Sequence, residues 1–178
     1  MKDDSGPKKR ISSTRGAPKH LDASLHQTGA IPSLGEVGLN QFAPYLMNRI
    51  ASRWNADVQE GVREHDLTVV KMRTLAVLSV IPSLSINELS VYTVTEQSTM
   101  SRTLDSLVEQ GLIHRRPQKG DARVREVELT NQGREIFAAY WPALYVGFTK
   151  LFAGVTEEEF NIFVQVLHKL VRNQEQKQ

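Results

Sequence analysis

The stretch EQSTMSRTLDSLVEQG, residues 96–111, decides the fold together with the basic segment that follows it. Its apolar side chains recur at i, i+4, i+7 and i+8, at Met100, Leu104, Leu107 and Val108. This spacing predicts a helix over residues 96–110 that buries one stripe and leaves its polar residues outward. Thr95 is expected to cap the start of this helix, and Gly111 is expected to end it.

The sequence LIHRRPQKGDARVREVELT, residues 112–130, predicts a β-hairpin. Apolar and polar residues alternate in LIHRR and in VREVELT, and PQKGDA supplies a loop longer than the tightest turns. Five cations surround that loop: Arg115, Arg116, Lys119, Arg123 and Arg125. Because an ordinary edge hairpin needs few charges for solubility, this concentration of cations indicates a polyanionic partner.

Three helical patterns precede this unit. Apolar residues at helical spacing predict a long first helix over residues 39–64. Thr68 is expected to cap a second helix, which ends before Pro82 because proline cannot extend the hydrogen-bond ladder. The motif SINE, residues 85–88, is a capping box that predicts a short third helix over residues 86–92.

Two more helical patterns follow the hairpin. Thr130 is expected to cap a helix over residues 131–151, which Pro142 should kink. The capping box TEEE, residues 156–159, predicts a last helix over residues 157–172. Six helices with a hairpin after the fourth predict a mainly α fold with a small β wing, the winged helix-turn-helix, in which the fourth helix is the recognition helix.

The recognition helix carries side chains that suit the major groove of DNA. Short hydrogen-bonding groups and one arginine face outward in its first half, at Gln97, Ser98, Ser101, Arg102 and Asp105. We expect Arg102 to read a base edge, preferably guanine. Ser98, Thr99 and Ser101 are expected to contact bases or phosphates.

The hairpin carries a second expected DNA contact. Arg123 near the tip is expected to enter the narrow minor groove, where the potential is most negative. Asp121, the only acid of the loop, is expected to hold Arg123 or the loop amides in place. Double-stranded DNA is therefore the expected partner of this surface.

Composition restricts the class of protein. A chain of 178 residues with 40% hydrophobic and 24% charged residues is typical of a soluble domain with a real core. The net charge is only +2, so nucleic-acid binding has to come from uneven placement of the charge. No apolar run is long enough to cross a bilayer and the N-terminus lacks a signal-peptide core, so we expect a cytoplasmic protein without membrane contact.

The sequence lacks the residues that several kinds of chemistry need. Cysteine is absent, which excludes disulfides, thiolate metal sites and thiol-based redox sensing. The histidines are dispersed, at His20, His26, His65, His114 and His168, so we expect no metal and no cofactor. A phosphate-binding glycine loop, a serine elbow and a paired metal-ligand motif are all missing, so we expect no enzyme. A winged helix that binds another protein is the alternative function.

Five segments, in order, resemble the multiple-antibiotic-resistance-regulator (MarR) family of bacterial transcription factors. They are LTVVKMRTL, INELS, STMSRTLDSLVEQGLIHRR, GDARVREVELTNQG and LFAGVTEEEF. The resemblance covers about residues 39–173. Its most specific piece is the Asp-x-Arg wing followed by Leu-Thr, here Asp121, Arg123, Leu129 and Thr130.

The resemblance implies a homodimer that grips a palindromic operator. The first, fifth and sixth helices would build the dimer interface, and the half-sites would lie about one helical turn, ~10 bp, apart. It places Ser98, Thr99, Ser101 and Arg102 on the recognition helix and makes Arg123 the minor-groove arginine of the wing. On family habit we expect a repressor.

Two residues depart from the family pattern. Val94 stands where the family often has glycine, so the turn has to avoid positive φ or bear some strain. Gln97 stands where the family commonly has arginine or another polar residue, which leaves the base preference open at that position.

The last two helices concentrate aromatic and aliphatic residues, which indicates burial against a second copy of the chain. The resemblance implies a small, often aromatic or phenolic, effector between the dimer helices and the DNA-binding lobe. Residues that combine aromatic walls with a cation are candidates for its site: Tyr45, Arg49, Arg53, Trp54, Met72 and Trp141. An aromatic acid and its CoA thioester both fit these residues.

The chain therefore divides into five expected segments. They are a flexible basic tail (residues 1–36), an N-terminal dimerisation helix (37–66), the DNA-binding lobe (67–130), C-terminal dimerisation helices (131–173) and a frayed end (174–178). The basic tail is either a solvated leader or an arm that contacts phosphates.

Overall fold

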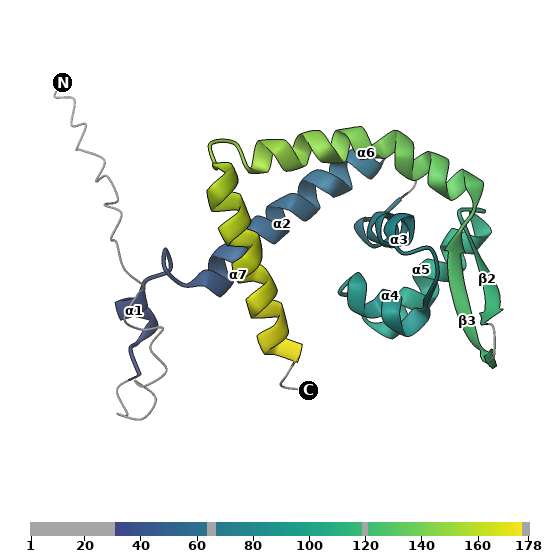
Figure 1. Cartoon of the computed structure of the whole chain (residues 1–178), viewed down its shortest axis with the longest axis horizontal. Helices are drawn as coiled ribbons and strands as arrows, with labels where there is room; N and C mark the ends of the chain where they lie inside the picture. Colours follow the sequence, from purple (N-terminus) through teal and green to yellow (C-terminus); the bar gives the residue numbers. More distant parts are fainter. Residues whose placement is uncertain (1–30, 64–66, 119–120, 176–178) are drawn as a thin grey trace, which may run out of the picture. The chain divides into compact units, whose positions relative to one another are not determined.

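The structure is a computed structural model that describes residues 31–63, 67–118 and 121–175, without the side chains of residues 118 and 121–124 (Figure 1). The chain forms two compact units, one ending at Ala51 and the other beginning at Ser52. The helices and strands are α1 (Leu34–Val37), α2 (Ala43–Val62), α3 (Val69–Val80), β1 (Leu84–Ser85), α4 (Ile86–Tyr92), α5 (Gln97–Glu109), β2 (Ile113–Gln118), β3 (Asp121–Leu129), α6 (Asn131–Leu151) and α7 (Glu157–Glu175).

The six predicted helices correspond to α2 through α7, and the predicted caps explain most of their boundaries. The Thr68 hydroxyl accepts a hydrogen bond from the Lys71 amide at the start of α3. Ser85 and Glu88 form the predicted capping box of α4. Each cap satisfies an amide at the helix start that has no partner within the helix, which is why these starts are readable from sequence.

The caps of the last two helices are confirmed as well. The Thr130 hydroxyl accepts from the Gly133 amide at 3.0 Å and donates to the Gly111 carbonyl at 2.7 Å, so it also ties α6 to the end of α5. Thr156 and Glu159 exchange the two bonds of a capping box, at 3.2 and 2.9 Å. The helix α6 continues through Pro142.

Three helix boundaries differ from the predictions. The helix α2 starts at Ala43 rather than at residue 39, since a turn fills residues 38–42. The cap of α5 is Glu96, because the Thr95 hydroxyl donates to the Thr93 carbonyl instead of accepting from the helix. The helix α7 continues to Glu175, three residues beyond the predicted end.

The hairpin loop is shorter than predicted, because β2 and β3 leave only residues 119 and 120 between them. Pairing continues past Pro117, with an irregular register: Pro117 lies opposite Arg125 and Gln118 opposite Asp121. The sheet order β1-β3-β2 makes β2 an edge strand, where a proline removes no ladder hydrogen bond. The short strand β1, which the sequence analysis missed, pairs Leu84 with Val127.

The core of the second unit lies between α3, α4, α5 and the sheet. Leu75, Leu89, Met100, Leu104 and Leu107 are completely buried there. The predicted stripe of the recognition helix is therefore correct at three positions. It is wrong at Val108, which is 41% exposed because the i+8 position lies at the edge of the stripe.

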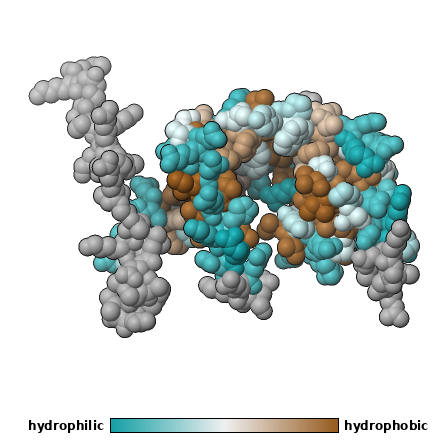
Figure 2. Space-filling view, in the orientation of Figure 1, coloured by the Kyte–Doolittle hydropathy of each residue, from teal (hydrophilic) through white to brown (hydrophobic). Residues whose placement is uncertain are grey.

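The two C-terminal helices bury almost nothing within one chain. Among the described residues, α6 buries only Gly133 and α7 buries none. Large apolar side chains stay exposed on both helices, and Figure 2 shows apolar surface among hydrophilic residues over these elements. They include Trp141, Tyr145, Phe148, Leu151, Ile162, Phe163, Val166, Leu170 and Val171.

Candidate ligand pocket and nucleic-acid interface

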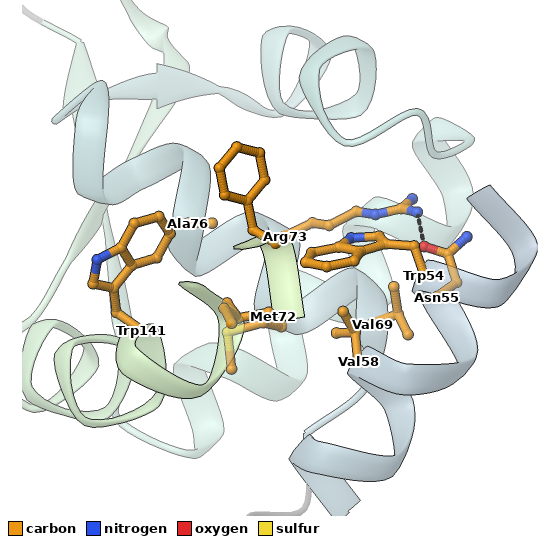
Figure 3. A pocket seen from close by; sticks show the side chains of 10 residues that line it. Trp54, Asn55, Val58, Val69, Met72, Arg73, Ala76 and Trp141 are labelled. Atoms are coloured by element: carbon orange, nitrogen blue, oxygen red, sulfur yellow. Dashed lines mark hydrogen bonds between the residues drawn. The ribbon is translucent and has the colours of Figure 1, made fainter. Parts of the chain in front are cut away.

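A cavity of about 240 Å³ lies between α2, α3 and α6 in the second unit (Figure 3). Its walls are mainly apolar and aromatic, and it is lined by Trp54, Asn55, Val58, Val69, Met72, Arg73, Ala76, Trp141, Leu144 and Phe148. Among the described residues that line it, Arg73 is the sole charged side chain. Both tryptophans of the chain contribute to this one cavity.

Three of the six predicted ligand residues, Trp54, Met72 and Trp141, line this cavity. Arg53 does not, because its side chain is 81% exposed and pairs with Asp57 at 3.1 Å on the outside of α2. Arg73, which follows Met72 directly in the sequence, lines the cavity although it was not among the predicted residues.

The remaining two predicted ligand residues, Tyr45 and Arg49, belong to the first unit. There the Arg49 guanidinium carbon lies 5.7 Å from the centre of the Tyr45 ring, a cation–π contact between successive turns of α2.

The guanidinium of Arg73 joins the cavity to the helix-turn-helix. Its Nη2 donates to Asn55 Oδ1 at 2.6 Å, the contact drawn in Figure 3. Its Nη1 donates to the Thr93 carbonyl at 3.2 Å. Thr93 is the C-cap of α4, so one side chain contacts both the cavity wall and the turn that leads into α5.

That turn is a Schellman motif with valine at the position where glycine is usual. The Val94 amide donates to the Val91 carbonyl at 3.1 Å, and the Thr95 amide donates to the Ser90 carbonyl at 2.9 Å. Val94 has φ 53°, a left-handed conformation that is uncommon for a β-branched residue. Of the two alternatives for this position, the turn bears strain rather than avoiding positive φ.

The N-terminal half of α5 presents the predicted polar residues to solvent. Gln97, Ser98, Thr99 and Arg102 are exposed, and Ser101 is half-buried. The Gln97 side-chain amide donates to Asn87 Oδ1 at 2.7 Å, which fixes its orientation against α4. That contact was not predicted, because Asn87 lies ten residues away across the turn.

Arg115 packs against the recognition helix. Its Nη2 lies 2.8 Å from Asp105 Oδ1 and 3.5 Å from the Ser101 carbonyl. Its side chain is only 32% exposed. This arginine therefore ties strand β2 to α5 and keeps the helix and the wing adjacent, a role that the count of hairpin cations does not show.

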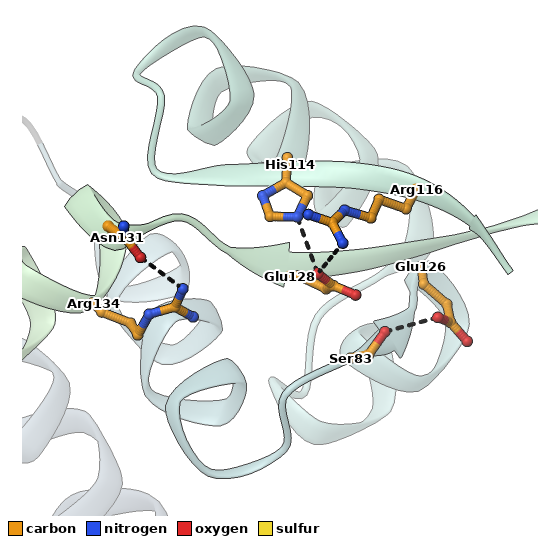
Figure 4. Close-up of polar contacts among 7 residues, drawn as sticks. All are labelled: Ser83, His114, Arg116, Glu126, Glu128, Asn131 and Arg134. Carbon is orange, nitrogen blue, oxygen red and sulfur yellow. Dashed lines mark hydrogen bonds and ion pairs between the residues drawn. The ribbon is translucent and has the colours of Figure 1, made fainter.

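Acidic residues on β3 offset part of the positive charge of the wing (Figure 4). Glu128 Oε2 lies 3.0 Å from His114 Nε2 and 3.6 Å from Arg116 Nη1. Glu126 accepts a hydrogen bond from the Ser83 hydroxyl at 2.9 Å. Both acids are in the quoted sequence, but only the fold shows that Glu128 contacts His114 and Arg116 whereas Glu126 contacts Ser83.

The rest of the wing is described in part. Arg125 is exposed on β3, opposite Pro117. Lys119 lies outside the described residues, as do the side chains of Asp121 and Arg123, so the expected contact between those two is not tested.

The described residues contain no group of three or more histidines and carboxylates placed to hold a metal ion. They also contain no helix with the length and hydropathy needed to cross a membrane.

Comparisons with known proteins agree with this geometry. A family model described as "MarR family" matches residues 65–124, which contain α3, α4, α5 and most of the wing. The chain is 25% identical over 144 residues to the HTH-type transcriptional repressor IacR of Pseudomonas putida, covering 81% of this chain and 86% of that protein.

Solved structures show the same relationship. The crystal structure of a MarR-family transcriptional regulator from Silicibacter pomeroyi is 39% identical, with a TM-score of 0.75, covering 80% of this chain and 96% of that one. Bordetella bronchiseptica BpsR, whose DNA binding is regulated by 6-hydroxynicotinic acid, shares the fold at 22% identity and a TM-score of 0.64, covering 72% of this chain and 98% of that one. The chain belongs to the MarR family of transcriptional regulators.

Proposed function

We propose that this regulator is a homodimeric repressor that binds a palindromic operator and is released from it by a small aromatic acid. The observation that carries the proposal is the polar, exposed N-terminal half of α5, held beside the basic wing by Arg115 and Asp105. Membership of the MarR family and similarity to a named repressor support the same function.

The DNA-binding surface combines base and backbone contacts. Arg102 projects from an exposed position of α5 and is proposed to read a base edge in the major groove. Ser98, Thr99 and Ser101 lie near the N-terminus of the same helix, where the helix dipole favours phosphate oxygens. Gln97 reaches the same groove from its contact with Asn87.

The wing supplies the remaining contacts. Arg123 is proposed to enter the minor groove, and Asp121, two residues earlier in the sequence, is proposed to hold it in place. Arg116, Lys119 and Arg125 are proposed to approach phosphates. Arg115 acts mainly through its contact with α5.

Dimerisation is proposed because many large apolar side chains of α6 and α7 stay exposed in the part of the chain that the structure describes. Trp141 and Tyr145 are both 51% exposed, and Ile162 is 54% exposed. Several large apolar side chains exposed side by side are typical of a surface that binds another chain. A two-fold contact with a second copy would bury the same residues on both sides. Sedimentation analysis should therefore give twice the chain mass.

The cavity beside Arg73 is proposed as the effector site. Its volume of about 240 Å³ lies just below the usual range for ligand pockets, which favours a single-ring acid over the much larger CoA thioester. Arg73 supplies a cation for a carboxylate, and the two tryptophans supply aromatic walls. The relative BpsR is regulated by an acid of this class, 6-hydroxynicotinic acid.

Binding to DNA from the region upstream of the protein's own gene tests this function. Fluorescence anisotropy should show tighter binding to that DNA than to random duplex, with log K falling steeply as log salt rises. A chain that ignores DNA at every salt concentration would instead be a winged-helix module that binds protein.

A further inference from the structure

Arg73 lines the cavity and also contacts the turn before the recognition helix. It lines the cavity from α3, donates to Asn55 on α2 at 2.6 Å, and donates to the Thr93 carbonyl at 3.2 Å. Both acceptors are neutral oxygens. Neither contact is therefore an ion pair, and neither acceptor carries a negative charge to balance that of the guanidinium.

The Thr93 carbonyl is a sensitive point of the turn. Thr93 is completely buried, and its own hydroxyl donates to the Leu89 carbonyl at 2.7 Å. The next residue is Val94, whose left-handed conformation is unfavourable and persists only where surrounding contacts hold it. The helix α5 begins at Gln97, so a shift of this turn moves the residues proposed to enter the major groove.

A carboxylate in the cavity would compete for the same guanidinium. Hydrogen bonds between two charged partners are roughly twice as strong as those between neutral groups, and arginine can hold a carboxylate with two parallel bonds. The other lining residues offer mostly apolar contacts, so an anion in the cavity has Arg73 as its partner. Turning the guanidinium toward the cavity costs the bond to Thr93.

We propose that Arg73 is the coupling residue of this regulator: an anionic aromatic ligand in the cavity draws its guanidinium from Thr93 and loosens the turn that positions α5. The inference rests on the proposed function, and it deepens that function by naming the charge of the effector and the bond through which it acts. A ligand can shift this equilibrium only through different affinities for the two arrangements, and the Arg73 contact supplies that difference.

The test compares acids with their neutral amides on the intact chain at pH 7.5. The probes are benzoate and benzamide, and 6-hydroxynicotinate and 6-hydroxynicotinamide. Because both tryptophans line the cavity, tryptophan fluorescence reports its occupancy directly. We expect each acid to bind at least ~10-fold more tightly than its amide, the factor that corresponds to losing one charged hydrogen bond.

Hydrogen exchange of residues 93–97 reports the turn without DNA. Each acid should speed exchange there in the parent protein, and Arg73→Met should show the fast exchange with no ligand and no further response to acid. Arg134→Met is the matched control, because Arg134 is an exposed arginine that also donates to an asparagine, Asn131, at 3.0 Å. It should behave as the parent in both measurements.

A second variant tests the same contact if Arg73→Met folds poorly. Asn55→Asp places a fixed carboxylate at the position that contacts Nη2, so it should weaken acid binding ~10-fold or more and leave amide binding unchanged. Equal affinity for acid and amide, no fluorescence response to either, or unchanged exchange of residues 93–97 in Arg73→Met would overturn the inference. Failure of the parent protein to bind DNA would refute the proposed function instead, because the tryptophan fluorescence and hydrogen-exchange measurements test the role of Arg73 without DNA.

Discussion

Replacing Val94 by glycine should stabilise the protein. Val94 holds φ 53° at the position after the C-cap of α4, where a side chain with a Cβ costs about 1–2 kcal/mol. The side chain is 85% exposed, so its removal loses little apolar burial. Glycine adds about 0.5–1 kcal/mol of chain entropy to the unfolded state, which offsets part of the relief.

The net gain is about 0.5–1 kcal/mol in the free energy of unfolding, or ~1–4 °C in Tm for a chain of this length. Urea unfolding followed by circular dichroism measures it, at one fixed protein concentration because dimers are stabilised by mass action. Gly111 is the matched control. It occupies the same position after α5 with φ 70°, and its added Cβ would meet only the flexible end of Gln132.

Gly111→Ala should therefore lower the free energy of unfolding by about 1 kcal/mol, because it introduces the Cβ that Val94→Gly removes. If Val94→Gly is clearly less stable than the parent while Gly111→Ala is neutral, the strain assigned to the turn before α5 does not exist.

Three further predictions follow from single contacts. Gly133→Ala should destabilise the fold by about 1–3 kcal/mol in urea unfolding, because the new Cβ would overlap a main-chain carbonyl oxygen just before β2; wild-type stability would contradict this close approach. Asp105→Ala removes the carboxylate that holds Arg115 against α5, so the preference for operator over random duplex should fall, while affinity for random duplex should not, because an acid has been removed; an unchanged preference would argue against the positioning role of this ion pair. Hydrogen bonds from Ser85 lower the pKa of Glu88 below its ordinary value of 4.5, so this cap stabilises the fold above that pH and loses its effect as pH falls through the lowered pKa. The loss of stability in Ser85→Ala should therefore become smaller in acid. A loss that does not depend on pH would refute the electrostatic contribution of the cap.

Local signals predicted most of the fold. The caps at Thr68, Ser85, Thr130 and Thr156 are confirmed because each needs only residues within one turn. Helical periodicity predicted α2 and α5 for the same reason, while the capping boxes predicted α4 and α7. Two failures differ in kind. The cap expected at Thr95 is a local prediction that is wrong, because its hydroxyl donates to the Thr93 carbonyl. The two-residue strand β1 exists only through its pairing with β3, and no local sequence pattern indicates it.

The candidate site was predictable in kind but not in detail. The composition of α5 and the hairpin indicated a DNA-binding surface, yet the contact of Arg115 with Asp105 depends on how the strand lies on the helix. The choice between Arg53 and Arg73 likewise depends on which face of a helix meets the cavity. Side-chain partners across elements are set by tertiary packing, which single-sequence periodicity does not contain.

Hydroxyl-radical footprinting on the upstream DNA shows whether α5 and the wing bind a duplex. We expect two protected half-sites about one helical turn, ~10 bp, apart, with protection over both grooves. Arg102→Ala should cost about 1–3 kcal/mol and relax base preference within each half-site, whereas Arg123→Ala should weaken protection on every sequence. An unprotected duplex, or footprints that neither substitution changes, would contradict the assignment of α5 and the wing to DNA.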